Sequence, residues 1–395
     1  MSANNLHLDI THLTALRHAL HEVPELGYEE FKTAAMIRAE LSRLDISPID
    51  GIADAPTATL GIIGDTRKPC VALRADIDAL PIVERTNVAY ASKHAGAMHA
   101  CGHDGHTAIL LGAAGVLKRI EAELPVCVKL LFQPAEEGGG GALRLVNAGV
   151  LDATERFGPR VQSVFGLHGW PGLPEGVVST RPGPILAATD TFTATFVGRG
   201  CHGAFPHLGI DPIVTAAEAV MSLQQFVSRE MDPTEPAVVT IGTFHAGTAT
   251  NVIPDTATIQ GTARTLTGAS RIKIAESIRR RCEHVARANR CTLKFDWHDG
   301  YPPTVNDPAS ADYVARVARD VLGAPRYIPA AGPAMGGEDF AYYLEKVPGC
   351  FFLIGLCPQG VDACAPLHSD RFDFNDAAIE TGVRMLVSLV QEWCA

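Results

Sequence analysis

The sequence has little positive charge, no long apolar run and no basic leader. It holds 33 Lys and Arg against 44 Asp and Glu, which gives a formal net charge of −11. Nucleic acids and anionic membranes are usually bound by basic surfaces, so neither is an expected partner. No apolar run reaches about 18 residues, the length that a membrane-spanning helix needs. The first nine residues lack the basic and apolar regions of a secretory signal, so we expect no secretion.

Cysteine pairs of the Cys-x-x-Cys type are absent as well. The ten cysteines are scattered over 395 residues, and in so long a chain they do not predict a disulfide framework. A reducing compartment fits best, so we expect a cytoplasmic protein. Hydrophobic residues make up 47% and charged residues 19%, which is typical of a globular protein with a large core. The length predicts two domains rather than one.

Strand and helix patterns alternate through both ends of the chain. The expected strands are 58–63, 70–73, 126–132, 161–167 and 350–355, and the expected helices are 10–26, 31–44, the run after His106, 308–322 and the C-terminus. This alternation predicts an α/β fold with a mixed, mostly parallel sheet flanked by helices. In such a fold, functional groups gather at the carboxyl ends of the strands.

The middle of the chain has a different pattern. Its order is strand, helix, strand, strand, helix, strand, over residues 191–197, 211–229, 237–244, 256–265, 271–288 and 292–297. That order predicts a ferredoxin-like α+β insert with an antiparallel sheet. We place this insert at residues 183–297, so that residues 1–182 and 298–395 form one discontinuous α/β domain.

Residues 98–106, Met-His-Ala-Cys-Gly-His-Asp-Gly-His, hold three histidines, one cysteine and one aspartate within nine positions. Cys101 and His103 lie two residues apart, so both can point into one cavity. Thiolate and imidazole are the donors that suit zinc and neighbouring transition metals. The alternative is a buried free cysteine beside surface histidines.

Other candidate donors follow predicted strands or lie in later loops. They are Asp76, Asp78, Glu136, Glu137, His168 and His368. With the Cys101 loop this set can hold two metal ions, which polarise a carbonyl and activate a water near neutral pH. One of the adjacent glutamates can bind metal while the other moves the proton of the water. The alternative for this glutamate pair is a solvated turn.

Several motifs in order resemble the metal-dependent aminoacylase and carboxypeptidase family, in the branch of hippurate hydrolases and indole-acetyl-amino-acid hydrolases. They are residues 74–81 (RADIDALP), 98–106 (MHACGHDGH), 133–137 (QPAEE), 166–169 (GLHG), 335–340 (MGGEDF), 366–368 (PLH), 198–204 (GRGCHGA) and 251–255 (NVIPD). The resemblance covers nearly the whole chain. It implies a catalytic domain interrupted by a smaller lid domain that also forms dimers.

The resemblance also implies roles for single residues. Metal ligands would be Cys101, His103, Glu137, His168 and His368, and Glu136 would be the general base. Asp78 would orient a metal-bound histidine. Two positions depart from other branches, which have a histidine in place of Asp76 and a bridging carboxylate where this chain offers the Cys101 thiolate.

In the insert, the resemblance implies that His202 stabilises the oxyanion, in some relatives in the site of the partner subunit. Asn251 and Arg264 would hold the free carboxylate of the substrate, and Gly337 would bring main chain near it. A guanidinium binds a carboxylate bidentately, which would favour acyl-amino acids over plain amides. The alternatives are a loop histidine for His202 and a surface ion pair for Arg264.

Together these residues predict a dinuclear metal-dependent amidohydrolase. It would cleave the amide of N-acyl or N-aroyl (hippurate-like) amino acids, with two divalent ions per subunit from among zinc, manganese, cobalt and nickel. We expect a homodimer, or a homotetramer if dimers pair further. The alternatives are a dipeptidase or carboxypeptidase of the same family and, in a different class, a non-catalytic ligand-binding scaffold.

Overall fold

The computed structural model describes residues 7–361 and 363–393, which form two compact units. The first unit runs up to Ile185 and also contains Val305–Gly332 and the chain from Asp339 on. The second unit comprises Leu186–Thr304 and Pro333–Glu338. It extends beyond residue 297, where the sequence places its end, because main-chain hydrogen bonds hold the following segment against β7 (Ala188–Val197), as between the Thr189 N–H and Tyr301 O at 3.0 Å.

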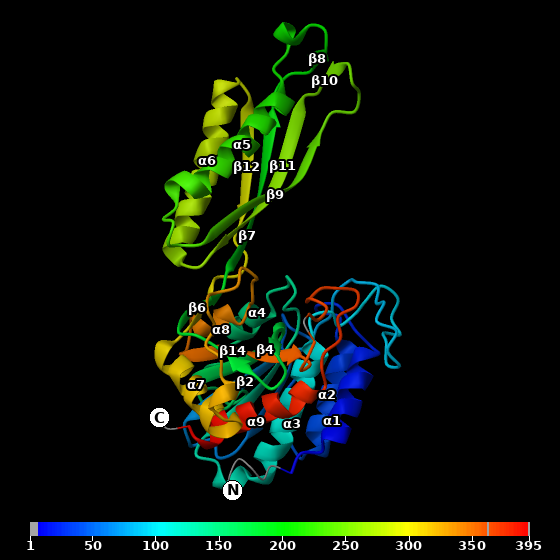
Figure 1. The fold of residues 1–395 in the computed structure, drawn as a ribbon, viewed down its shortest axis with the longest axis vertical. Coiled ribbons are helices and arrows are strands. Elements are labelled where there is room, and N and C mark those ends of the chain that lie inside the picture. The colour runs from blue at the N-terminus through cyan, green and yellow to red at the C-terminus, as the bar shows by residue number, and fades with distance from the viewer. Residues whose placement is uncertain (1–6, 362, 394–395) are drawn as a thin grey trace. The chain divides into compact units, whose positions relative to one another are not determined.

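A six-stranded sheet forms the centre of the first unit (Figure 1). Its order is β1-β3-β2-β4-β14-β5, in which the four inner strands are parallel and the two edge strands antiparallel. The strands are β1 (Thr59–Ile63), β2 (Cys70–Asp76), β3 (Cys127–Gln133), β4 (Val161–Pro174), β5 (Val178–Ser179) and β14 (Gly349–Cys357). The predicted mixed, mostly parallel sheet is therefore confirmed.

Helices flank this sheet and complete its core. They are α1 (Ile10–His21), α2 (Phe31–Arg43), α3 (His103–Arg119), α4 (Gly141–Asn147), α7 (Pro308–Leu322), α8 (Ala341–Leu344) and α9 (Ala377–Gln391). Helices α1, α3 and α9 pack against one another, and a Cβ on Gly112 of α3 would lie 2.7 Å from both Leu13 and Val383. Within the described residues, no helix is long and apolar enough to cross a membrane.

Helix α1 ends at His21, five residues before the end that the sequence predicts. The cause is Pro24, which lacks a main-chain N–H and disfavours helical backbone in the residue before it. The segment instead becomes extended, and Glu25 O accepts a hydrogen bond from the main-chain N–H of Ala79 at 2.9 Å. That contact connects the segment before α2 to the segment that carries Asp78.

The second unit has the predicted ferredoxin-like arrangement. Its sheet has the order β12-β7-β11-β9 and is antiparallel throughout. Besides β7, the elements are α5 (Pro212–Glu230), β9 (Ala237–Ala246), β11 (Thr256–Thr265), α6 (Gly268–Ala288) and β12 (Thr292–His298). Helices α5 and α6 lie side by side on one face, over a separate apolar core that contains Phe192, Phe196 and Phe226 (Figure 1).

Short elements complete the description of both units. The strand pairs are β8 (Cys201–His202) with β10 (Val252–Ile253) and β6 (Gly183–Leu186) with β13 (Thr304–Asn306). The 3-10 helices η2 (Glu121–Glu123), η3 (Pro206–Leu208) and η4 (Ala324–Arg326) lie in connections.

Candidate active site

Three parallel strands and one helix deliver most of the predicted metal donors to one edge of the sheet. Asp76 ends β2, and Glu136 follows β3 by three residues. Cys101 and His103 stand at the start of α3. His168 lies inside β4, which continues to Pro174, and not after the strand as the sequence predicts. The carboxyl ends of parallel strands meet at one edge of a sheet, which explains why residues so far apart in sequence converge.

The predicted donors form groups whose ligand atoms lie within 4.8 Å of one another. The groups are Cys101 with His103 and His168, Cys101 with Glu137 and His368, and His103 with Glu136 and Glu137. The first two groups share Cys101. Its Sγ lies 3.3 Å from His168 Nε2, and His368 Nε2 lies 3.2 Å from Glu137 Oε1.

His103 is held with one ring nitrogen directed into this cluster. Its Nδ1 lies 2.9 Å from Asp78 O and 3.2 Å from Asp78 Oδ1, two acceptors, so Nδ1 carries the proton. In the neutral form of the ring, which a metal would bind, Nε2 then has the free lone pair. Nε2 is buried and has no hydrogen-bond partner among the described residues. Asp78 also accepts the main-chain N–H of Glu137 at 2.9 Å, so one carboxylate orients two of the predicted ligands.

His168 is oriented in the same way. Its Nδ1 donates to Gly169 O at 2.8 Å, which leaves Nε2 facing the Cys101 sulfur. Burial, together with the neighbouring His106 and His103, lowers the pKa of His168 well below its ordinary value. The ring is therefore neutral near pH 7 and keeps the lone pair that a metal requires.

The electrostatics of the cluster fit a cation. Burial and the carboxylates of Glu137 and Glu136 raise the pKa of the Cys101 thiol well above its ordinary value. Burial alone would lower the pKa of His103, but Asp76, Asp78 and Glu137 raise it to about 10. A bound divalent cation would convert the thiol to a thiolate and compensate the carboxylates. Thiolate, imidazole and carboxylate donors together suit zinc and neighbouring metals.

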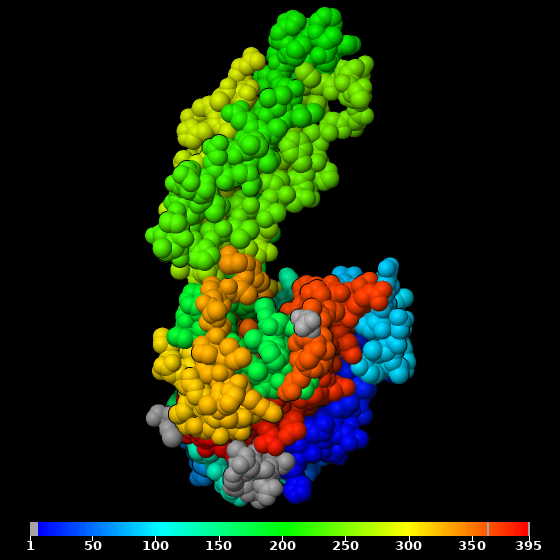
Figure 2. Space-filling model, viewed as in Figure 1, coloured from blue at the N-terminus to red at the C-terminus, as the bar shows by residue number. Residues whose placement is uncertain are grey.

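The remaining predicted ligand, His368, lies on an exposed loop. Residues 358–361 and 363–367, between β14 and His368, lie on the surface of the first unit, in orange-red in Figure 2. The side chain of His368 is 53% exposed, in contrast to the fully buried side chain of His103. The main-chain N–H of His368 donates to Ala100 O at 2.8 Å, which fixes the loop beside the other donors.

Glu136, the predicted base, sits in a strained turn. It is 7% exposed, and its Oε1 accepts the main-chain N–H of Asp339 at 3.3 Å. The preceding Ala135 has a φ of +53°, a conformation that a non-glycine residue rarely adopts. Glu30 stabilises this turn, since its Oε1 accepts the Ala135 N–H at 2.9 Å and its Oε2 accepts the Thr57 hydroxyl at 2.6 Å. Burial raises the pKa of Glu30 to about 7.

Sequence reasoning missed Glu30, which lies 105 positions before Ala135. The only signal was a pair of acidic residues directly before a predicted helix, and that pattern indicates a helix terminus rather than a site. It also missed Arg74 and Asp339 as partners, although both lie inside motifs quoted above.

Two of the predicted second-unit residues, His202 and Asn251, lie together. His202 pairs with Val252 between β8 and β10, and the Gly203 N–H donates to Asn251 O at 2.7 Å. His202 Nδ1 accepts the Ala204 N–H at 3.0 Å, so the proton of the neutral ring is on Nε2. His202 is exposed, so this Nε2–H is available as a donor.

Arg264 and Gly337 lie elsewhere in the second unit, around Thr189. Arg264 pairs with Thr189 between β11 and β7, and its Nη1 donates to Ala263 O at 3.2 Å. A Cβ on Gly337 would lie 2.1 Å from Thr189 Cγ2, so only glycine fits there. No ion pair of Arg264 with a carboxylate is present among the described residues, and burial lowers the pKa of its guanidinium.

β8 and β10 lie at one end of the second-unit sheet (Figure 1), and Arg264 and Gly337 lie beside Thr189 at the other. Thr256 faces Val197 at the end near β8, and Arg264 faces Thr189 at the other end. At about 3.4 Å per residue the eight intervening steps span about 27 Å. The second unit of one chain therefore does not gather its four predicted residues in one place.

Comparisons with known proteins cover nearly the whole chain. The model of Peptidase family M20/M25/M40 matches residues 72–392, a range that contains every predicted metal donor. An IAA-amino acid hydrolase of Arabidopsis thaliana is 41% identical over 96% of this chain and 85% of its own. An N-acetyl-L-cysteine deacetylase of Bacillus subtilis is 41% identical over 93% of this chain and 84% of its own. The crystal structure of a dinuclear metal-binding peptidase of the M20 family from Bacillus subtilis has a TM-score of 0.83 at 36% identity, over 96% of this chain and 97% of that one.

Proposed function

Because the chain belongs to Peptidase family M20/M25/M40, we propose that it is a dinuclear metal-dependent amidohydrolase that cleaves N-acyl or N-aroyl amino acids to a carboxylic acid and a free amino acid. It is a hydrolase, as its relatives are. This removes the scaffold alternative. The names of the IAA-amino acid hydrolase and the N-acetyl-L-cysteine deacetylase support an amino acid conjugate as substrate.

The observation that carries the proposal is the pair of donor groups that share Cys101. One group would use Cys101, His103 and His168, and the other Cys101, Glu137 and His368. Bound divalent ions would polarise the scissile carbonyl and lower the pKa of the attacking water. Cys101 belongs to both donor groups, and its thiolate would make the donor set softer than a carboxylate would.

Glu136 is the proposed general base. It lies in one donor group with His103 and Glu137, so its carboxylate is within reach of a water held there. The carboxylate accepts a proton from the attacking water and passes it to the leaving nitrogen. The Asp339 N–H holds Oε1.

His202 is the proposed donor to the oxyanion, through its Nε2–H. Thr256, at the sheet end near His202 and Asn251, lies about 27 Å from Arg264 along β11, at about 3.4 Å per residue. We therefore propose a homodimer in which His202 and Asn251 serve the site of the other copy, while Arg264 and Gly337 serve their own. Lid closure would exclude water from the reaction. A homotetramer of paired dimers and a cytoplasmic location stay predictions from the sequence.

A substrate and metal panel tests the proposal. The metal-free protein is reloaded separately with zinc, manganese, cobalt or nickel and assayed on N-acetyl amino acids, hippurate, indole-acetyl amino acids and dipeptides. We expect hydrolysis of the acyl or aroyl amino acids with at least one metal. Faster turnover of dipeptides would favour the peptidase alternative, and absence of metal-dependent turnover on every substrate would overturn the proposal.

A further inference from the structure

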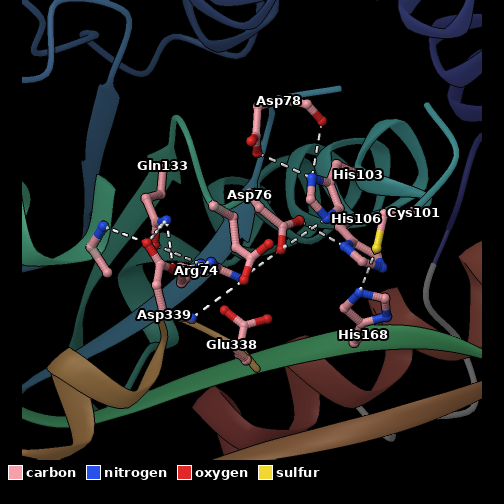
Figure 3. Close-up of polar contacts among 12 residues, drawn as sticks. Arg74, Asp76, Asp78, Cys101, His103, His106, Gln133, His168, Glu338 and Asp339 are labelled. Carbon is pink, nitrogen blue, oxygen red and sulfur yellow. Dashed lines mark hydrogen bonds and ion pairs between the residues drawn. The ribbon is translucent and has the colours of Figure 1, made fainter. Parts of the chain in front are cut away.

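Arg74 is a buried cation that faces the site but is none of the predicted ligands or bases. Its side chain is 0% exposed and lies on β2, two residues before Asp76. Nη1 donates to Asp76 Oδ2 at 2.6 Å, Nη2 to Asp339 Oδ1 at 2.9 Å and Nε to Gln133 Oε1 at 2.9 Å (Figure 3). A guanidinium stays charged at any accessible pH and presents its donors in one rigid plane. It therefore fixes the two carboxylates relative to each other.

The Asp76 carboxylate connects Arg74, through further hydrogen bonds, to the predicted metal ligand His168. His106 Nε2 accepts the main-chain N–H of Gly169 at 2.8 Å, so the ring proton is on Nδ1, which donates to Asp76 Oδ1 at 2.7 Å. Gly169 O in turn accepts the Nδ1 proton of His168 at 2.8 Å. The chain of contacts thus sets the orientation of His168, with Nε2 directed at Cys101.

The same contacts decide what Asp76 and His106 do. Both oxygens of Asp76 accept hydrogen bonds, one from His106 and one from Arg74. The Nε2 lone pair of His106 is occupied by the Gly169 N–H. His106 therefore has no free ring nitrogen for a metal in this arrangement, whereas each Asp76 oxygen keeps a second lone pair. Together with His103 the two side chains form a candidate group by distance.

Asp339, the second carboxylate, connects Arg74 to the proposed base Glu136. Asp339 accepts hydrogen bonds from Arg74, from Gln133 Nε2 at 2.8 Å and from the Ala142 N–H at 2.9 Å. Its own main-chain N–H donates to Glu136 Oε1 at 3.3 Å. Asp339 is therefore anchored through its side chain and orients Glu136 through its main chain.

We propose that Arg74 is a positioning residue. It fixes the orientation of His168 through Asp76 and His106. It fixes that of Glu136 through Asp339. The inference rests on the proposed function for the roles of His168 and Glu136. A lysine keeps the charge but not the planar fork, so it could not hold both carboxylates at once.

The test separates the two branches, which are the contacts from Arg74 to His168 and the contacts from Arg74 to Glu136. His106→Leu breaks the branch to His168, and we expect zinc affinity, measured by chelator competition, to fall about 10- to 100-fold. His106→Gln offers one donor and one acceptor and should restore part of that loss. In the metal-free protein labelled with 15N-histidine, the NMR signals of His168 should show its Nδ1 proton exchanging more freely in the leucine variant.

Asp339→Asn weakens the branch to Glu136. We expect kcat on an acyl-amino acid to fall roughly tenfold or more, with KM and zinc affinity nearly unchanged, since a displaced base loses part of its contribution. Arg74→Lys should show both losses together. Lys129→Met is the control, because Lys129 is also a fully buried cation, on neighbouring β3, and binds Val150 O at 2.8 Å. It should lower thermal stability without either loss.

The proposal is overturned if folded Arg74→Lys keeps both zinc affinity and kcat, or if Lys129→Met reproduces the two losses. Should Arg74→Lys not fold, His106→Leu and Asp339→Asn decide, and wild-type zinc affinity in the first with wild-type kcat in the second would overturn it. If the wild-type protein turns over no substrate, the proposed function fails, and zinc affinity and the His168 signals still test the Arg74 branch to the ligand.

Discussion

The two units hold their functional side chains in different ways. In the first unit the predicted ligands His103 and His168 are buried, and each has its second ring nitrogen tied to Asp78 or Gly169. In the second unit His202 and Asn251 are exposed, on a two-stranded ribbon beyond the main sheet. Buried groups with fixed partners are already oriented for a metal, whereas exposed groups gain their environment only when substrate or another chain covers them.

This contrast suggests that the two units contribute to the function in different ways. We propose that the first unit supplies a preorganised, charged centre, in which the donor atoms of His103 and His168 have their orientation before anything binds. The second unit supplies exposed groups, whose contribution depends on the substrate or the other chain that covers them. Changes at the predicted first-unit residues should therefore alter metal binding, chemistry or stability of the free protein. Changes at the predicted second-unit residues should alter turnover or substrate binding and leave metal content unchanged.

The largest expected effect is that of Glu136→Gln. The amide cannot accept the proton of the attacking water, so kcat should fall by about 10²- to 10⁴-fold. Bound zinc, measured by elemental analysis, should stay at the wild-type level. Glu137→Gln is the matched variant and should lose zinc instead. Activity of Glu136→Gln close to that of the wild type would contradict the assignment of the base.

His202→Ala tests the exposed end of the second unit. Loss of an oxyanion donor should lower kcat by about 10²- to 10³-fold while zinc content stays unchanged. His207→Ala changes another exposed histidine, in η3, and should have little effect.

The same variant tests whether His202 serves the other copy. Mixing His202→Ala with Glu136→Gln chains, after dissociation and reassembly, should restore activity, because one site of each mixed dimer would then have both wild-type residues. Mixed dimers as inactive as the two parents would show that His202 serves its own chain.

Stability should depend on pH through His21, a buried histidine of the first unit. Burial lowers its pKa, but Asp104, at 2.8 Å, and Glu84 raise it above the ordinary 6.5 to about 9. The stabilisation from the protonated ring is fully present below pH 6.5 and is lost as pH rises through about 9. The shift corresponds to roughly 3 kcal/mol.

Chemical denaturation of His21→Gln measures this effect. The variant should lose most stability at pH 6 and much less at pH 10. Exposed His245 of the second unit is the control, since His245→Gln should change stability little at either pH. Equal losses for His21→Gln at both pH values would show that the pairing with Asp104 does not carry the effect.

The smallest expected effect is that of Arg264→Met. If the guanidinium binds the free carboxylate of the substrate, KM should rise roughly tenfold or more, since a hydrogen bond to a charged group contributes about 1.5–3 kcal/mol. The same substrate with its carboxylate converted to an amide should bind wild type and variant alike. An equal rise in KM for both substrates would indicate that Arg264 only supports its own strand.

Much of this protein follows from local sequence patterns. The alternation of strand and helix predicted the α/β sheet, and the order of elements in the insert predicted the ferredoxin-like unit, because both depend on hydrophobic periodicity that is visible within one segment. The donors Cys101, His103 and His168 were predicted because thiolate and imidazole suit zinc and neighbouring metals and because their motifs resemble a known family.

Other partners within the site were decided by the tertiary structure alone. Arg74 and Asp339 are 265 positions apart, and Glu30 meets Ala135 across 105 positions. Their pairing depends on which strands become neighbours and on which carboxylates become buried. Neither can be predicted from the hydrophobic periodicity of one segment. The sequence by itself determined which elements form and which residues can bind metal. Only the folded chain decided that Asp76 is occupied by hydrogen bonds and that His202 and Arg264 lie at opposite ends of one sheet, because burial and long-range contact arise when the sheet assembles.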